Sequence, residues 1–175
     1  IIRQVGQFYI EESIKMKWDD IGDQPCSVAR MLSVIGDRWT MLILRNAFMG
    51  IRRFDDFQKS LGVTRHVLSD RLKRLVEYEI LVKAPYFDRQ ERFEYRLTDK
   101  GFELYPIILS MANWADKWMD QGLGKPLEYR HKACGHKFEP VMVCSVCREP
   151  LHAKQVQVSA GPGYFAYMEQ KQKQA

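Results

Sequence analysis

Four polar side chains that can bind DNA lie on one face of a predicted helix. From Arg65 to about Glu79, apolar residues recur at helical spacing and predict a buried stripe, formed by Leu68, Leu72, Leu75 and Val76. The open face then carries Arg65, His66, Ser69 and Lys73. Arginine can form two hydrogen bonds with guanine, and serine and histidine can form hydrogen bonds with base edges. A lysine one turn further along the helix is well placed to bind a phosphate. This face predicts contact with double-stranded DNA.

Further arginines flank this helix in the sequence. Arg52 and Arg53 precede a short predicted helix, and Arg89 and Arg92 flank the tip of a predicted hairpin. A helix N-terminus and a nearby arginine both favour anions. A basic hairpin tip beside a groove can contact phosphate or enter a narrow minor groove. We therefore predict that these four arginines also contact DNA.

The net charge of the chain is concentrated in the same region. Residues 26–100 contain 15 Lys and Arg against 10 Asp and Glu, whereas the rest of the chain contains 12 of each. A basic segment on an otherwise neutral chain indicates a polyanionic partner. The alternative for any single arginine is a solvated surface charge, and Arg71, next to Asp70, can pair within the protein.

A second group of residues has the spacing of metal ligands. His131 and Cys134 are followed, after nine intervening residues, by Cys144 and Cys147. Two such pairs can fill the four corners of the tetrahedron that zinc takes in structural sites. They predict a zinc-ribbon-like module with a structural zinc ion. Because no position would stay open for water, hydrolysis is not expected.

Several alternatives stay open for the histidines and cysteines. His136 and His152 are alternatives to His131 as the fourth ligand, and a metal-free ribbon with free thiols is the alternative to zinc. Cys26 stands alone ahead of the first predicted helix. It is either a thiol that reacts with oxidants or electrophiles or an inert, half-buried residue.

The elements that would position these residues are mainly helical. Helices are predicted between Pro25 and Gly36, over 38–48, around 54–61 and over 65–79, with Asp37 and Thr64 as N-caps. A hairpin follows, with its tip at 88–90 and an alternating strand over 93–97. A long helix over about 99–121 contains Pro106, which either kinks the helix or places its true start near residue 105.

The predicted fold class is α+β, mainly helical: a winged helix–turn–helix with a dimerisation helix and a small C-terminal ribbon-like module. We expect an N-terminal extension over 1–25. Because Met16 is a plausible start, its first 15 residues are either an extension or foreign to the native protein. The winged domain is predicted over 26–98, the dimerisation helix over 99–121 and the ribbon-like module over 122–163. Residues 164–175 are expected to form a frayed tail. No internal repeat is visible.

The long predicted helix carries an apolar stripe that needs a partner surface. Ile107, Met111, Trp114 and Trp118 recur on one side of it. They predict a homodimer contact, and the alternative is an intramolecular core helix. A two-fold dimer would place two recognition helices about one DNA turn or a multiple of it apart.

Composition and motifs narrow the class of protein. An apolar content of 46% and a charged content of 28% allow a packed core. Apolar runs are too short to cross a bilayer and no signal peptide is visible, so we expect a cytoplasmic protein without a membrane partner. Paired acid and base residues, a nucleophile elbow and a phosphate loop are all lacking, so an enzyme is not expected. The alternative to a DNA-binding regulator is a protein-interaction module built on the ribbon.

Residues 26–121 resemble the HxlR family of bacterial winged-helix transcription regulators. The motifs that carry the resemblance are Cys26, Gly36-Asp37-Arg38-Trp39-Thr40, Leu42-Ile43-Leu44-Arg45, Arg53-Phe54-Asp55-Asp56-Phe57, Val67-Leu68-Ser69-Asp70-Arg71-Leu72 and Tyr95-Arg96-Leu97-Thr98-Asp99-Lys100-Gly101. The resemblance implies a homodimer that binds an inverted repeat and represses a nearby gene. It also implies a small-molecule or redox signal received at Cys26. The family often has proline at the wing tip, whereas this chain has Asp88-Arg89-Gln90-Glu91-Arg92, so the wing contacts are expected to differ.

Overall fold

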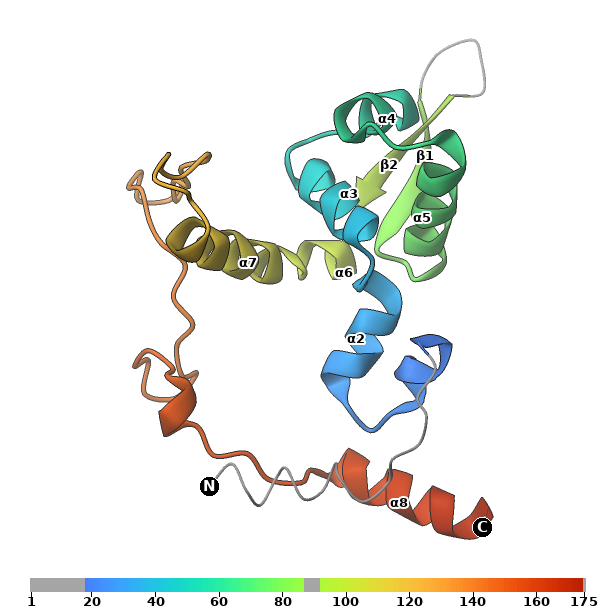
Figure 1. Ribbon diagram of the computed structural model, residues 1–175, viewed down its shortest axis with the longest axis vertical. Coiled ribbons are helices and arrows are strands. Elements are labelled where there is room, and N and C mark those ends of the chain that lie inside the picture. Colours follow the sequence, from blue (N-terminus) through green and yellow to red (C-terminus); the bar gives the residue numbers. More distant parts are fainter. Residues whose placement is uncertain (1–17, 87–91, 175) are drawn as a thin grey trace. The chain divides into compact units, whose positions relative to one another are not determined.

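A computed structural model of the chain describes residues 18–86 and 92–174 (Figure 1). The described residues form two compact units, one of residues 34–140 and one that combines residues up to 33 with residues from 141 onward. In this part of the chain, no helix has both the length and the apolar character needed to cross a membrane. The predicted domain limits at residues 25, 98, 121 and 163 remain predictions.

The unit of residues 34–140 contains helices and one two-stranded sheet. Its elements are, in order, α3 (Arg38–Phe48), α4 (Phe54–Leu61), α5 (Arg65–Glu77), β1 (Leu81–Tyr86), β2 (Arg92–Leu97), α6 (Asp99–Phe102) and α7 (Tyr105–Trp118). The strands are antiparallel, and their register runs from Leu81 opposite Leu97 to Tyr86 opposite Arg92. The mainly helical class with a small antiparallel sheet is therefore confirmed, and Figure 1 shows the hairpin beside α5.

A tight turn joins α4 to α5. Gly62 ends α4 with a φ of 64°, a left-handed conformation that glycine adopts without steric cost. Thr64 is the N-cap of α5, as predicted, and its hydroxyl accepts a hydrogen bond from the backbone N–H of Val67 at 3.4 Å. The α5 helix ends at Glu77, two residues before the predicted end, and Glu79 has a φ of 56°. Two helices joined by a short turn form the predicted helix–turn–helix.

The core lies between α5 and the two helices before it. Helix α5 packs against both α3 and α4. The fully buried apolar side chains are Ile43, Leu44, Phe57, Leu68, Leu72, Leu75 and Leu81. Burial of one such side chain contributes about 1.5–3 kcal/mol. The predicted stripe of α5 is therefore buried at three of its four positions, and Val76 is half-buried.

Asp37 connects the start of α3 to the middle of α5. Its Oδ1 accepts hydrogen bonds from the backbone N–H groups of Trp39 at 3.0 Å and Thr40 at 3.1 Å, which caps α3 as predicted. The same oxygen accepts a bond from Nε of Arg71 at 2.9 Å. Arg71 also pairs with Asp70. Arg71 is therefore a structural residue of the recognition helix and pairs within the protein.

The segment after β2 contacts the C-terminal end of α5. The Thr98 hydroxyl donates to the carbonyl of Glu79 at 2.6 Å, and Lys100 Nζ donates to the carbonyl of Tyr78 at 2.8 Å. Gly101 lies so close to this end that a Cβ atom there would be 2.2 Å from the carbonyl oxygen of Ile80. Only glycine fits at this approach. The motif Thr98-Asp99-Lys100-Gly101 thus attaches α6 to the end of α5.

The long helix predicted over 99–121 is two helices. The short α6 ends at Phe102, and α7 begins at Tyr105 with Pro106 in its first turn, where the missing N–H of proline costs nothing. The predicted alternative of a start near residue 105 is confirmed. Phe48 of α3 packs on Tyr105 with ring centroids 4.9 Å apart, so α7 is attached to the winged core at its first residue.

The remaining helices lie at the two ends of the described chain. They are a 3-10 helix η1 (Trp18–Asp23), α2 (Ser27–Ile35), a second 3-10 helix η2 (Ala153–Gln155) and α8 (Pro162–Gln174). The expectation of a frayed tail from residue 164 is wrong. Pro162 begins a helix favourably, and the Glu, Gln, Lys, Met and Ala residues after it are good helix formers.

We expect Asp37 to contribute measurably to stability. Asp37→Ala removes the cap of α3 and the partner of Arg71, so the free energy of unfolding should fall by about 1–2 kcal/mol in a urea titration. Asp37→Asn keeps an oxygen that can cap the helix and should cost less. Full stability of the Ala variant would contradict the role assigned to Asp37.

The same residue predicts a pH dependence. Burial raises the pKa of the Asp37 carboxyl, but hydrogen bonds from Arg71, Thr40 and Trp39 and the Arg71 charge outweigh it and lower the pKa below 3.8. A carboxyl whose pKa is lowered by folding stabilises the protein above its unfolded pKa and loses this effect as pH falls through the folded value. The stability difference between the wild type and Asp37→Ala should therefore shrink below about pH 3.8.

Candidate nucleic-acid interface

The N-terminal half of α5 presents a polar surface to solvent. The structure places Arg65, His66, Ser69 and Lys73 on this helix, and all four are exposed. Lys73 forms an exposed ion pair with Glu77 at 3.6 Å, a contact that is weak in water and can exchange for a phosphate. The geometry required for a recognition helix, a buried face fixed on the core and an open polar face, is present.

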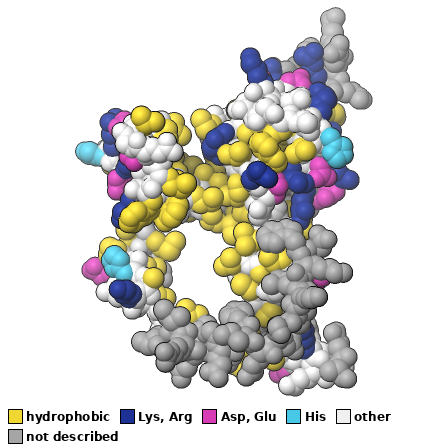
Figure 2. All heavy atoms as spheres, in the orientation of Figure 1, with side chains coloured by type: hydrophobic (Ala, Val, Ile, Leu, Met, Phe, Trp, Pro, Cys, Tyr) yellow, Lys and Arg dark blue, Asp and Glu magenta, His cyan; other side chains and the backbone are white. Residues whose placement is uncertain are grey.

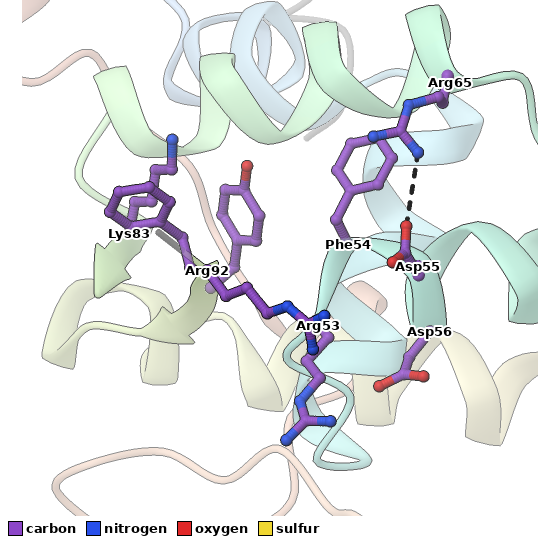
Figure 3. Close-up of a pocket in the computed structure, with 9 residues that line it drawn as sticks. Arg53, Phe54, Asp55, Asp56, Arg65, Lys83 and Arg92 are labelled. Carbon is purple, nitrogen blue, oxygen red and sulfur yellow. Dashed lines mark hydrogen bonds and ion pairs between the residues drawn. The ribbon is translucent and has the colours of Figure 1, made fainter. Parts of the chain in front are cut away.

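A cavity of about 480 Å³ lies beside the start of α5. It is open to solvent between the first turn of α4, the first residue of α5 and the two wing strands (Figure 3). Its lining combines cations, two carboxylates and aromatic rings: Arg53, Phe54, Asp55, Asp56, Arg65, Lys83, Arg92, Phe93 and Tyr95. Three of the predicted DNA contacts, which come from separate parts of the sequence, line this cavity together: Arg53, Arg65 and Arg92 (Figure 3).

Arg65 is oriented by two contacts with α4. Its guanidinium lies 4.6 Å from the centre of the Phe54 ring and 3.5 Å from Oδ1 of Asp55 (Figure 3). A cation over an aromatic face is attracted by the ring, and the carboxylate adds a weak, exposed ion pair. Arg65, which is predicted to bind guanine, is therefore positioned at the cavity, and its side chain is still largely exposed.

The wing strands supply a cation that the sequence analysis did not single out. Lys83 of β1 lines the cavity, and its Nζ lies 4.1 Å from the centre of the Phe93 ring of β2. In the sequence, Lys83 is one charge within an apolar strand, and nothing nearby marks it as a site residue. The cross-strand register that brings it beside Phe93 is a property of the folded hairpin.

Of the predicted phosphate contacts, Arg53 and Arg92 line this cavity. Arg53 is the N-cap residue of α4 and forms a bridge with Glu94 of β2, and the carbonyl of Arg52 accepts a bond from the Tyr95 N–H at 2.7 Å. These contacts attach the segment before α4 to the outer edge of the wing. Arg89 lies outside the described residues.

Basic side chains gather over the wing and the start of α5. In Figure 2, Lys and Arg side chains lie over this part of the winged unit. The carboxylates of Asp55, Asp56 and Glu94 reduce the positive charge of this surface. Glu94 is buried and pairs with Arg96. A convex helix face with a cationic cavity beside it matches the electrostatic footprint of a DNA-binding surface.

The stripe predicted as a dimer contact is exposed along α7. Trp114 and Trp118 are 60% and 66% exposed, and Met111 and Ile107 are 52% and 36% exposed. Leu109, on the opposite side of the helix, is buried. The alternative of a helix whose Trp stripe packs into the core of its own unit therefore does not fit, because the stripe faces away from that core.

The predicted metal ligands lie in two short hairpins. Nδ1 of His131 is 3.4 Å from Sγ of Cys134. Backbone N–H groups of Cys147 and Val146 and the Cys147 side chain form hydrogen bonds with the Cys144 thiol and lower its pKa. Among the described residues, no three His, Cys, Asp or Glu side chains gather as a ready metal centre, so each hairpin offers one pair.

Cys26 precedes the first residue of α2. Its carbonyl accepts the first helical hydrogen bond, from the N–H of Arg30 at 3.0 Å, and its side chain is half-exposed. The structure therefore leaves the thiol within reach of small reagents.

The helix–turn–helix, the two-stranded wing and the basic exposed face of α5 together define a winged-helix DNA-binding protein. Residues 34–123 match the HxlR-like helix-turn-helix family, and the chain belongs to that family. It is a transcriptional regulator of the helix–turn–helix type.

Known relatives agree with this class. An uncharacterised HTH-type transcriptional regulator of Mycobacterium tuberculosis is 41% identical over 140 residues, which cover 80% of this chain and 89% of that protein. The crystal structure of PA1607, described as a candidate transcription factor, is 36% identical, with a TM-score of 0.70, and covers 78% of this chain and 95% of that one. The redox regulator HypR in its reduced form is 27% identical, with a TM-score of 0.51, and covers 56% of this chain and 96% of that one.

We expect Asp55 to restrain Arg65 and to weaken DNA binding. Asp55→Asn removes the ion pair and one negative charge from the cavity rim, so affinity for duplex DNA should rise about two- to fivefold, since an exposed pair is worth about 0.2–1 kcal/mol. Fluorescence anisotropy at fixed salt measures this.

Asp56→Asn is the matched control. It removes the same charge from the neighbouring residue of the same cavity, but no ion pair between Asp56 and Arg65 is seen. If the two variants gain affinity equally, the effect is one of net charge and the Asp55 contact plays no part.

Proposed function

We propose that this regulator binds an inverted-repeat operator as a homodimer and represses transcription of a nearby gene. The observation that carries the proposal is the exposed face of α5, formed by Arg65, His66, Ser69 and Lys73, on a helix that is fixed to the core by Arg71. The residues near the start of a recognition helix are those that reach base edges in the major groove.

The roles of the residues follow from their places on the surface. Arg65, His66 and Ser69 read bases, and Lys73, one turn further on, binds a phosphate. Arg52, Arg53 and Arg92 bind the DNA backbone on the side of the wing, and we assign the same role to Arg89 from the sequence alone. Base contacts set the preferred sequence, whereas phosphate contacts set affinity and salt dependence.

The exposed stripe of α7 supports the dimer. Two tryptophans one turn apart, each exposed by more than half, form an apolar surface that is costly to leave in water. Packing the stripe against its copy about a two-fold axis buries it and relates the two recognition helices by symmetry. The operator is then a palindrome with half-sites spaced by about 10 base pairs or a multiple.

Selection of random duplex DNA on the purified protein tests the operator directly. We expect a palindromic consensus and a steep loss of affinity with salt. His66→Ala and Ser69→Ala should each relax the preference at one position in each half-site, by about 1–3 kcal/mol of discrimination, because each removes a base contact.

Lys73→Ala should instead weaken binding to all sequences and reduce the salt slope by about one. Lys132→Ala removes the same charge from the first cysteine hairpin and should leave the slope unchanged. If the protein binds DNA without sequence preference and without salt dependence, the regulator mechanism is wrong and a protein-interaction module is favoured.

The dimer is tested by a charge placed in the stripe. Trp114→Glu should convert the dimer to a monomer in analytical ultracentrifugation and weaken binding to a full palindrome far more than to a half-site. Asn113→Asp adds a negative charge to α7 on a side away from the stripe and should stay dimeric. A wild-type protein that is monomeric at micromolar concentration contradicts this part of the proposal.

The proposal includes a thiol signal at Cys26. The similar protein HypR is a redox regulator, and the Cys26 side chain of this chain is half-exposed. Diamide, which converts thiols to disulfides, should lower the affinity of the wild type for its operator and leave that of Cys26→Ser unchanged. An equal response in both proteins would remove Cys26 as a sensor.

A further inference from the structure

A cavity of about 230 Å³ lies between α7 and the segment of residues 125–140 that follows it. Two of its lining residues, Asn113 and Asp116, belong to α7, and the others belong to this segment, whose residues 129–138 form the first cysteine hairpin. All of them lie within the unit of residues 34–140. Of the described residues that are predicted to bind DNA or zinc, none lines this cavity. The cavity is therefore a feature to which no role has been assigned.

The α7 side of the cavity is the side of the helix that faces away from the tryptophan stripe. Asn113 and Asp116 follow the buried Leu109 at spacings of four and seven residues, so the three share one side of the helix. Both lining residues are half-buried, whereas Trp114 and Trp118 are mostly exposed. A ligand in the cavity would therefore contact α7 and leave the proposed dimer surface uncovered.

Two aromatic rings form the opposite side of the cavity. Tyr129 and Phe138 lie at the base of the hairpin, where the Phe138 N–H donates to the carbonyl of Tyr129 at 3.1 Å. The ring centroids are 6.4 Å apart, and the ring planes are inclined by 52°. Leu127 and Pro140 add apolar surface to the lining. Aromatic faces carry partial negative charge and attract organic cations such as ammonium groups.

The charged lining residues leave one carboxylate without a close cation. Lys125 pairs with Glu139, and Lys137 pairs with Glu128 at 2.7 Å. Among the residues that the structure describes, no cation lies within ion-pair distance of Asp116. Three carboxylates against two lysines give the lining a net charge of −1. This charge favours a cation in the cavity and disfavours an anion.

The charge of Asp116 extends to the aromatic side of the cavity. Burial raises the pKa of the Tyr129 phenol, and the charges of Tyr105 and Asp116 raise it further. The carboxylate and the Tyr129 ring therefore act on the same space, although they come from different elements of the fold.

We propose that this cavity binds a small organic cation, with an ammonium group on an apolar body. The ammonium group pairs with Asp116 and lies against the rings of Tyr129 and Phe138, and the apolar body packs on Leu127 and Pro140. A carboxylate beside aromatic rings attracts an ammonium group by two electrostatic interactions at once. The ligand is small, because the cavity is below the range of about 300–1,000 Å³ that is typical of drug-sized ligands.

An NMR titration of the full wild-type chain with benzyltrimethylammonium tests the site. We expect saturable shifts of the backbone amide signals of Asp116, Tyr129 and Phe138, with one site per chain. Benzyl alcohol and benzoate have the same ring without the positive charge, and each should bind at least about tenfold more weakly. This comparison needs no variant, so it does not depend on the folding of one.

Two substitutions locate the interaction. Asp116→Asn keeps the size of the side chain, removes its charge and should weaken binding of benzyltrimethylammonium about tenfold, and Phe138→Leu should weaken it about threefold. Asp120→Asn is the matched control, because it removes the same charge outside the cavity and keeps an oxygen that can accept the hydrogen bond from the Gly122 N–H. The control should bind as the wild type does.

Three results would overturn the site. They are the absence of saturable binding of benzyltrimethylammonium to the wild type, equal binding of benzyl alcohol, and equal losses of affinity in Asp116→Asn and Asp120→Asn. None of these readouts involves DNA, so a failure of the site is distinguishable from a failure of the proposed function.

The ligand would also act as an effector, a role that rests on the proposed function. Because the cavity is built on α7, binding there changes the surroundings of the proposed dimer helix. Benzyltrimethylammonium should therefore change the affinity of the wild type for its operator and leave that of Asp116→Asn unchanged. Saturable binding without any change in operator affinity would overturn the effector role and support the site alone.

Discussion

The contact between Asp37 and Arg71 is the interaction on which the winged unit depends. One carboxylate caps α3 and binds an arginine in the middle of α5, so the direction of the recognition helix is fixed relative to the first helix of the core. At its other end, α5 is attached to the segment after the wing by Thr98 and Lys100. The N-terminal turns of α5 carry most of the polar face, and Arg65 there contacts Phe54 and Asp55 of α4. A recognition surface requires this combination, because base readout tolerates little uncertainty in the position of the helix.

The cationic cavity shows how the wing and the helix–turn–helix act as one surface. Its lining residues come from α4, α5 and both strands. Two of the cations in this lining are oriented by aromatic rings. Arg65 lies over Phe54, and Lys83 lies over Phe93. Such stacking orients a flexible side chain without neutralising its charge. The acidic residues at the rim then limit the affinity for polyanions in general, which leaves more of the discrimination to base contacts.

The apolar side chains of α7 have different surroundings at its start and along the rest of the helix. Tyr105 at its start packs on Phe48 of the winged core. The tryptophan stripe along the rest of the helix faces solvent. In the proposed dimer, a second copy of the chain covers this stripe.

The sequence by itself determined the elements whose signals are local. The boundaries of α3 and α4, the caps Asp37 and Thr64, the buried stripe of α5 and the polar face opposite it all follow from helical spacing and from the chemistry of helix ends. Tertiary structure decided what local patterns do not encode. The partner of Arg71 is 34 residues away in the chain, Lys83 becomes a cavity residue only through strand register, and Gly101 is required by a carbonyl that lies 21 positions earlier. The cysteine hairpins around residues 131–136 and 144–149 share one pattern of backbone hydrogen bonds, thirteen residues apart. The sequence hid this repeat, because different side chains can satisfy the same backbone pattern.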